Sequence, residues 1–299
     1  MTADVPEWIA AGQGLRPRLQ WAFTTDAPLV AIDLAGESGE TLAADAAGGL
    51  YLLDRRGHVI CMTRGFQALK ALAWCQTGER GAAVLGETRL VGFHRQLGID
   101  WSIDLPAPVA ALAIEPFGNF TAASLASGTT FLFGPGRARQ SEFETVRPLR
   151  HLRFLATEAT LIGCADHGLL CAHELDGSEL WTETLMTTVG DMTATADGAA
   201  IYLAAFSLGI QVFGRQGTGR GSFLVDGTPN RVSSGFGRGR LAATTMERQL
   251  YWLGTNGDLV WATVLPDEPC AVRCDPLGHG LVCGLKAGRL VRLEWLQLP

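Results

Sequence analysis

The chain repeats itself at intervals of forty residues. Apolar or proline residues mark this spacing at Leu29, Leu69, Val109, Leu149, Val189, Pro229 and Pro269, and a second apolar column follows three residues later, from Ile32 to Val272. Periods of about 40 to 45 residues with strand-like content are typical of β-propellers, in which each repeat folds into one four-stranded blade. The sequence therefore predicts an all-β fold, a seven-bladed β-propeller with four-stranded antiparallel blades of about forty residues.

Within each repeat, the periodicity predicts four strands in a fixed order. Segments such as PLVAIDL (28–34) and PLRHLRF (148–154) alternate apolar with small or polar residues, and they are predicted to be the innermost strands. Glycines in shared columns, such as Gly78 and Gly118, mark the turns that follow. The outer strand carries a tryptophan column at Trp21, Trp101, Trp181 and Trp261, with Cys61, Ser141 and Gly221 in the intervening repeats. We expect these tryptophans, together with Phe143 and Phe223, to fill the gaps between neighbouring blades.

The two ends of the chain complement each other. The next member of the tryptophan column would fall at about residue 301, beyond Pro299, so the last blade lacks its outer strand. The segment 15–23 supplies a replacement, and we expect it to pair with the strand around Leu290 to Trp295 and to close the ring. The predicted domains are an N-terminal extension, 1–14, and a single seven-bladed propeller, 15–299. Asp4, Pro6 and Glu7 favour a short helical turn in the extension, ending near Gly12.

Composition narrows the class of protein. Hydrophobic residues make up 47% of the chain, yet no uninterrupted apolar stretch approaches the roughly 18 residues that a membrane helix needs. The N-terminus has acidic residues where a signal peptide is basic, and the seven cysteines fall mostly in small or apolar columns, which indicates packed thiols in a reducing compartment. A net charge of −6 argues against a general nucleic-acid binder. We therefore expect a cytoplasmic protein with no membrane span.

Candidate functional residues are sought where the repeats disagree, since such positions are released from the common packing. On the predicted inner strands the departures are Arg147, Arg150, His151, Arg153, Asp191, Arg231 and Arg273. Inner strands surround the central channel of a propeller, so these side chains are predicted to give the channel a polar, arginine-rich lining. Arginine presents a planar fork suited to carboxylate or phosphate, and one hypothesis is a site for an acidic peptide or a small anion. The alternative is that Asp191 pairs with Arg231 or Arg153 between adjacent blades.

Other motifs carry weaker signals. Cys270, Cys274, Cys283 and His279 have metal-ligand residue types, but close CxxC pairs are missing and two of the cysteines fall in packing columns. The pairs Asp54 with His58 and Asp166 with His167 or His173 have no nucleophile at a recognisable spacing. The run GRQGTGRGS (214–222) joins two predicted strands and opens no helix, so it is interpreted as a basic outer hairpin. We predict no catalytic residue, no metal and no cofactor.

The glycine-to-tryptophan spacing in LDGSELW (175–181) and TNGDLVW (255–261), each after an apolar strand, resembles the repeats of WD-repeat-like and quinoprotein (PQQ)-like propellers. The resemblance covers residues 15–299, although the chain lacks the Trp-Asp dipeptide and the positioned Gly-His pair of true WD repeats. It implies mainly binding platforms, together with some quinone-dependent dehydrogenases.

Two function classes follow from the sequence. The first is a non-catalytic protein-interaction scaffold that binds partner proteins or peptides through the loop faces and channel mouth, as a subunit of a bacterial cytoplasmic assembly. We expect a bacterial source because lysine is scarce. Only two of the 24 lysine and arginine residues are lysines, and such a bias is typical of high-GC genomes. The second is a small-molecule-binding or metal-dependent hydrolytic propeller, for which Asp33, Asp45 and Asp191 are the nearby carboxylates.

Overall fold

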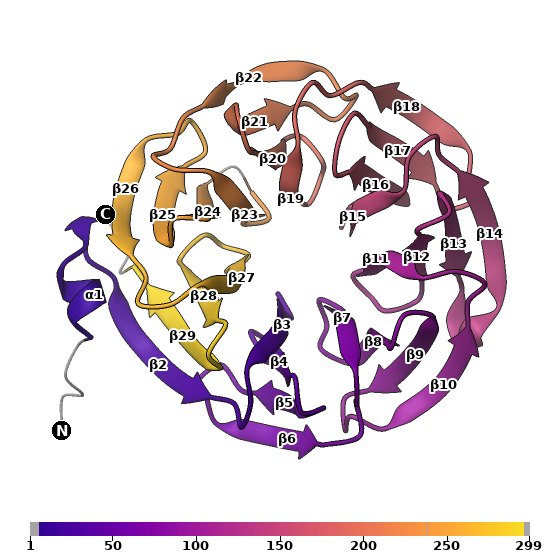
Figure 1. The fold of residues 1–299 in the computed structure, drawn as a ribbon, viewed down its shortest axis with the longest axis horizontal. Coiled ribbons are helices and arrows are strands. Elements are labelled where there is room, and N and C mark those ends of the chain that lie inside the picture. The colour runs from indigo at the N-terminus through magenta and orange to yellow at the C-terminus, as the bar shows by residue number, and fades with distance from the viewer. Residues whose placement is uncertain (1–5, 238, 296–299) are drawn as a thin grey trace.

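The computed structural model describes residues 6–237 and 239–295. Seven antiparallel sheets stand around a central axis like the blades of a propeller, and each sheet runs from an inner to an outer strand (Figure 1). The inner strands of all seven blades begin at the residues of the forty-residue column, from Leu29 in the first to Pro269 in the last. The predicted seven-bladed β-propeller is confirmed.

The strands follow the chain in blade order. Blades 1 and 2 comprise β3 (Leu29–Leu34), β4 (Thr41–Asp45), β5 (Leu50–Leu53) and β6 (Val59–Thr63), then β7 (Leu69–Trp74), β8 (Arg80–Leu85), β9 (Arg89–His94) and β10 (Ile99–Asp104). Blades 3 and 4 comprise β11 (Val109–Ile114), β12 (Thr121–Leu125), β13 (Thr129–Phe133) and β14 (Arg139–Glu144), then β15 (Leu149–Phe154), β16 (Thr160–Ala165), β17 (Leu170–Glu174) and β18 (Glu179–Glu183). Blades 5 and 6 comprise β19 (Val189–Ala194), β20 (Ile201–Ala205), β21 (Gly209–Phe213) and β22 (Gly219–Phe223), then β23 (Pro229–Ser234), β24 (Arg240–Thr245), β25 (Gln249–Gly254) and β26 (Leu259–Val264). Blade 7 comprises β27 (Pro269–Cys274), β28 (Gly280–Leu285), β29 (Arg289–Glu294) and β2 (Arg18–Thr24), and a 3-10 turn, η1 (Pro135–Arg137), precedes β14.

The N-terminal strand closes the ring. β2 pairs antiparallel with β29, with Trp21 opposite Arg292 and Phe23 opposite Leu290, and so supplies the outer strand of blade 7 (Figure 1). This pairing confirms the closure predicted from the missing eighth position of the tryptophan column. It covers an edge of β29 that would otherwise offer unpaired backbone groups to another chain.

The segment before β2 packs on blade 6. The short helix α1 (Glu7–Ala10) lies outside the ring beside β26, and β1 (Gln13–Gly14) pairs with β26 as a fifth strand (Figure 1). Gly12 lies so close to the Trp261 indole that a Cβ there would be 2.3 Å from its Nε1 atom. The sequence did not predict this fifth strand. The division into 1–14 and 15–299 stays a prediction, and Asp4, at the expected helix start, lies outside the described residues.

The outer-strand column ties each blade to the next. The indole of Trp21 lies against Gly57 of the following blade, and Trp181 lies against Gly217 in the same way. Phe143 and Phe223 contact Gly177 and Gly257, so the predicted filling of the gaps between blades is confirmed for these four side chains. Each contact falls on the glycine of a hairpin turn with positive φ, where a side chain has no room.

Residues that replace tryptophan in this column keep a related hydrogen bond. The Trp21 indole Nε1 donates to the carbonyl of Arg55, the Cys61 thiol to that of Gln96, and the Ser141 hydroxyl to that of Leu175. All three acceptors lie in the turn before the outer strand of the next blade. At two of the three positions without tryptophan, Cys61 and Ser141, the side chain therefore still donates a hydrogen bond across the blade junction.

The ring has two faces, which differ in the loops they carry. One face, here called the connection face, bears the links from an outer strand to the next inner strand, at 25–28, 64–68, 105–108, 145–148, 184–188, 224–228 and 265–268. The opposite face bears the turns that follow the inner strands, at 35–40, 75–79, 115–120, 155–159, 195–200, 235–237 and 275–279. Within the described residues, no helix is long and apolar enough to cross a membrane.

Candidate functional site

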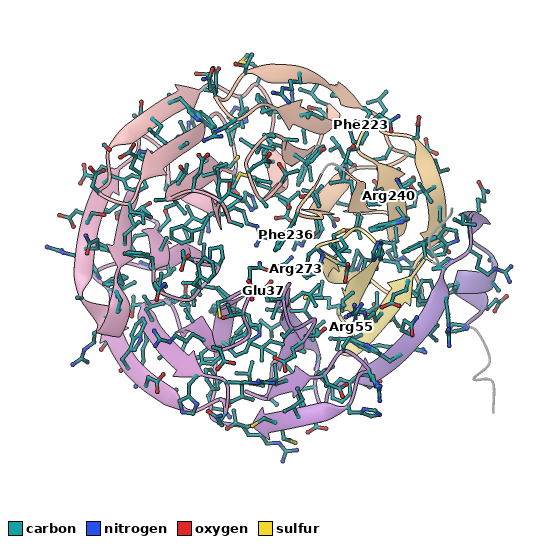
Figure 2. The ribbon with its side chains drawn as sticks, turned by 180° about the vertical axis from the view of Figure 1, so that it is seen from behind. Glu37, Arg55, Phe223, Phe236, Arg240 and Arg273 are labelled. Atoms are coloured by element: carbon teal, nitrogen blue, oxygen red, sulfur yellow. The ribbon has the colours of Figure 1, made fainter. Side chains whose placement is uncertain are left out.

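A cavity of about 430 Å³ occupies the centre of the ring and is lined by all seven inner strands. Figure 2 shows Glu37, Phe236 and Arg273 beside this central opening. Cavities of about 300 to 1,000 Å³ are typical of ligand sites, so the channel is large enough to accept a small molecule or a side chain.

A β-bulge near the start of every inner strand shapes the channel wall. The register shifts between the first and third residues of each, as between Leu149 and His151 or between Val189 and Asp191. A bulge places two residues opposite one and increases the local twist. His151, Asp191 and Arg231, which share one column of the repeat, follow directly after this irregularity and all line the cavity.

His151 and Asp191 contact each other between the inner strands of blades 4 and 5. The Nδ1 atom of His151 lies 3.8 Å from Oδ1 of Asp191. The Asp191 carboxylate also accepts the amides of Met192 at 2.8 Å and of Val232, on the next inner strand, at 3.2 Å. Burial lowers the pKa of His151, against the opposing effect of the Asp191 charge, so the imidazole is neutral at pH 7. Asp191 thus ties blade 5 to blade 6.

Arg231 donates to main-chain carbonyls. Its Nε atom donates to the carbonyl of Cys270 at 3.0 Å, and its Nη1 atom donates to that of Gly190 at 3.3 Å. These acceptors belong to the inner strands of blades 7 and 5, on either side of Arg231 in blade 6. The guanidinium therefore clamps three successive blades.

A second ion pair lies in the middle of the channel. The Nε atom of Arg273 donates to Oδ1 of Asp33 at 2.9 Å, and Oδ2 of Asp33 accepts the amide of Trp74 at 2.9 Å. In the same column of other blades, the hydroxyl of Ser233 accepts the amide of Cys274 at 2.8 Å. Side chains of this column thus accept amides of the next inner strand at three blade junctions, between blades 1 and 2, 5 and 6, and 6 and 7, which explains why carboxylates and hydroxyls occur in the channel wall.

Arg153 differs from the other channel arginines. Within the described residues it has no hydrogen bond and no carboxylate within ion-pair distance. Burial lowers the pKa of Arg153, the nearby charge of Arg273 lowers it further, and the carboxylates of Asp33 and Asp191 oppose the shift. The channel therefore contains one guanidinium whose charge is not compensated by direct contact.

The remaining two predicted residues lie toward the connection face. Arg150 lines the cavity and places its Nε atom 3.3 Å from Oδ2 of Asp166. Arg147 is exposed in the link before β15 and lies over Gly168, outside the cavity lining. Six of the seven predicted site residues thus line one channel.

The pairing differs from both partners proposed for Asp191. Among the described residues, Asp191 lies within ion-pair distance of His151. Neither Arg231 nor Arg153 lies within that distance of the Asp191 carboxylate. Asp33, considered from the sequence as a metal ligand, is instead the partner of Arg273. The anion-binding role of the arginines stays a prediction. Two lining residues, Lys70 and Phe236, escaped the sequence analysis although both depart from small or apolar neighbours in the repeat.

Hydrogen bonds link successive turns around the channel mouth at the opposite face. Main-chain amides of Glu37, Gln76, Ala156, Ala196 and Phe236 donate to the carbonyls of Gln76, Pro116, Ala196, Phe236 and Pro276, each about one repeat further on. This partial ring of hydrogen bonds draws successive turns together. Pro116 and Pro276 have no amide hydrogen, so the ring is interrupted at these two residues.

Close packing at this mouth centres on Gly36. A Cβ at Gly36 would lie 3.0 Å from Cζ of Phe236 and 2.8 Å from Cγ of Pro276, and the Gly36 amide donates to the Gln76 side chain at 2.8 Å. Side chains from three other blades therefore converge on blade 1.

The other candidates from the sequence, the cysteine cluster and the glycine-rich run, take part in core packing and in contacts within the protein. Cys274 and Cys283 belong to the core, and the Cys270 thiol donates to the carbonyl of Val30. The glycine-rich run forms the β21–β22 hairpin, where Arg215 pairs with Glu158 and Arg220 donates to the carbonyl of Ala199.

The acidic candidates are hydrogen-bonded within their own blades. The carboxylate of Asp45 accepts the Tyr51 hydroxyl and two turn amides, and that of Asp54 accepts two turn amides and contacts His58. The ring of His173 stacks on Phe143 with centroids 3.7 Å apart. In the part of the chain that the structure describes, no three His, Cys, Asp or Glu side chains gather in a group that could hold a metal ion.

Fold and channel define the chain as a seven-bladed β-propeller. Comparison with solved structures supports this class: the β-propeller domain of Cps50 (Swd1) from Myceliophteria thermophila superposes with a TM-score of 0.81. That match covers 94% of this chain and 100% of the other, at 15% sequence identity, and it shows a shared fold. The sequence matches no protein-family model and no curated protein.

Proposed function

We propose that this propeller is a non-catalytic interaction scaffold that binds a partner protein on its connection face, as a subunit of a bacterial cytoplasmic assembly. The observation that carries the proposal is a group of three exposed apolar side chains: Val146 is 92% exposed, Met186 86% and Leu224 80%. They lie in three consecutive links between blades, 145–148, 184–188 and 224–228.

These three are the most exposed large apolar side chains in the described part of the chain. Met246, 58% exposed in the β24–β25 turn, adds a fourth on the same face. Exposed apolar groups gathered on one region of a surface mark protein contact sites more often than scattered ones do. The exposed arginine nearby, Arg147, is of a residue type enriched at such contacts.

The surroundings of the three candidate carboxylates, two in the channel and Asp45 outside it, favour a scaffold over the metal-dependent hydrolytic alternative. Asp33, Asp45 and Asp191 each accept at least two hydrogen bonds from groups of the protein itself. Such carboxylates have few lone pairs left for a metal ion, and their contacts hold turns and neighbouring blades in place.

The test compares two faces of the same molecule. Affinity-tagged protein is purified from its native source, and the proteins retained with it are quantified by mass spectrometry. We expect the triple variant Val146→Asp, Met186→Asp and Leu224→Asp to lose its main partner, and the control variant Phe117→Asp, Leu277→Asp on the opposite face to keep it. Phe117 and Leu277 are 56% and 73% exposed, so the control alters comparable surface.

All five substitutions fall on exposed side chains, where stability changes are usually within about 0.5 kcal/mol. Loss of binding by the triple variant with an unchanged unfolding curve would therefore report on the surface itself. Equal retention of the partner by wild type and triple variant, or loss in the control instead, would refute the proposal.

A further inference from the structure

The charges in the middle of the channel do not balance. Three guanidinium groups, those of Arg153, Arg231 and Arg273, share the cavity wall with two carboxylates, those of Asp33 and Asp191. Arg273 forms an ion pair with Asp33, and Arg231 donates hydrogen bonds to main-chain carbonyls. Arg153 is left with a charge that no described group contacts. A partly buried charge is stabilised by a partner of opposite sign, and the cavity has space for one.

Arg153 and Arg273 approach the cavity from different walls. They occupy the same column of the repeat on β15 and β27, the inner strands of blades 4 and 7, which are separated by at least two other blades. In Figure 2, Arg273 lies at the edge of the central opening. A group held between the two side chains would receive donors from the guanidinium of Arg153 and from Nη2 of Arg273, since Nε and Nη1 of Arg273 already donate to Asp33 and to the carbonyl of Val272. Arginine N–H groups bind carboxylate and phosphate well.

The two mouths of the channel differ in their side chains. At the opposite face, Phe236 and Pro276 pack close to Gly36. At the connection-face mouth, Lys70 and Arg150 add positive charge, although Lys70 contacts Glu87 at 3.3 Å and Arg150 contacts Asp166. An anion approaching from this side meets cationic side chains before it reaches Arg153.

We propose that the channel binds one oxyanion group, a carboxylate or a phosphate, between Arg153 and Arg273. The site is separate from the apolar side chains of the connection face and does not require them. The oxyanion can come from free inorganic phosphate or from an acidic side chain of a peptide that reaches into the channel. Both sources present negatively charged oxygen atoms that accept hydrogen bonds from the guanidinium groups.

The experiment measures binding to the full chain by isothermal titration calorimetry with two probes. One probe is inorganic phosphate, and the other is a blocked aspartate-glycine peptide, with the asparagine-glycine peptide as its neutral control. We expect at least one probe to bind wild type, and Arg153→Gln to weaken that binding by about tenfold or more. Arg153→Lys keeps the positive charge but lacks the planar guanidinium, and we expect its affinity for the probe to lie between those of wild type and Arg153→Gln. Arg89→Gln, which removes an exposed arginine on β9, is the matched control and should bind as wild type does.

The outcomes separate the sources and can overturn the site. Binding of phosphate alone identifies a free anion, binding of the aspartate peptide alone identifies a partner side chain, and binding of both identifies a general oxyanion site. Failure of both probes to bind at millimolar concentration, or equal affinity in wild type and Arg153→Gln, would overturn the proposal. Stability offers a second readout that does not depend on the probe. Because Arg153 lacks a partner, Arg153→Gln should leave the ligand-free protein at least as stable as wild type, and a clear loss of stability would contradict the assignment.

Discussion

Arg292 provides the sharpest test of how the ring is held together at its closure. Its side chain is 1% exposed, on β29 opposite Trp21 of the closing strand. Its Nη2 atom lies 3.2 Å from Oδ2 of Asp275, its Nε atom donates to Glu294 at 3.0 Å, and its Nη1 atom donates to the carbonyl of Gly39, in blade 1, at 3.1 Å. One guanidinium thus joins the last blade to the first.

Replacement of Arg292 by methionine keeps much of the volume and removes the charge. Asp275, 9% exposed, then retains the amide of Leu277 as a hydrogen-bond donor but loses its cation. Removal of one partner from a buried ion pair typically costs about 3 to 5 kcal/mol, because the other charge stays buried without compensation. We therefore expect Arg292→Met to lower the free energy of unfolding by that amount. For a chain of 299 residues this corresponds to a Tm lower by about 5 to 8 °C.

The assay is urea unfolding followed by tryptophan fluorescence and circular dichroism, for wild type, Arg292→Met, Asp275→Asn and the double variant. Because the double variant no longer buries the Asp275 carboxylate without its cation, we expect it to recover at least about 1 kcal/mol relative to the sum of the single losses. A loss below about 1 kcal/mol in Arg292→Met, or strictly additive effects in the double variant, would refute the reasoning.

Three further predictions concern packing and ionisation. Gly57→Ala should lower the free energy of unfolding in urea more than Gly221→Ala does. Both glycines have positive φ, but a Cβ at Gly57 would overlap the indole of Trp21 in blade 7, whereas a Cβ at Gly221 would meet open space. Gly12→Val should displace the N-terminal segment from Trp261 and speed its cleavage in limited proteolysis, whereas unchanged cleavage would count against the fifth strand of blade 6. The free energy of unfolding should fall as pH rises above about 8.5, because burial raises the pKa of several thiols and the unfolded chain releases their protons first. In the folded protein at pH 8 the partly exposed Cys61 should alkylate fastest, and rapid labelling of the five buried cysteines would contradict this account.

Much of the fold could be predicted because the sequence repeat has a constant length of forty residues. Blades of equal size place equivalent residues at equal radius, so the column that begins at Leu29 marks the start of every inner strand. The tryptophan column has no further member after Trp261, which likewise indicated that a segment from the other end completes blade 7. Such arguments depend on the periodicity of the sequence.

Side-chain partners could be predicted only to the level of the channel. The departures at His151, Asp191 and Arg231 indicated a polar lining, but which acid meets which base depends on the twist of each strand and the direction of each side chain. Asp191 therefore contacts His151, and Arg231 turns to main-chain carbonyls.

Two features were missed for different reasons. Arg292 interrupts a column of mostly apolar residues that includes Leu52, Leu132 and Trp252, so a signal for its buried ion pair was present in the sequence. The pairing of β1 with β26 had no comparable signal, because the segment lies outside the repeat and is two residues long.

The most direct test of the central claim, that a partner docks on the connection face, is hydrogen–deuterium exchange on the assembly purified from the native source. Compared with the isolated chain, we predict slower exchange in the links 145–148, 184–188 and 224–228, and unchanged exchange in the opposite-face turns 115–120 and 275–279. Slowing confined to those turns, or to the outer strands of the rim, would contradict the account.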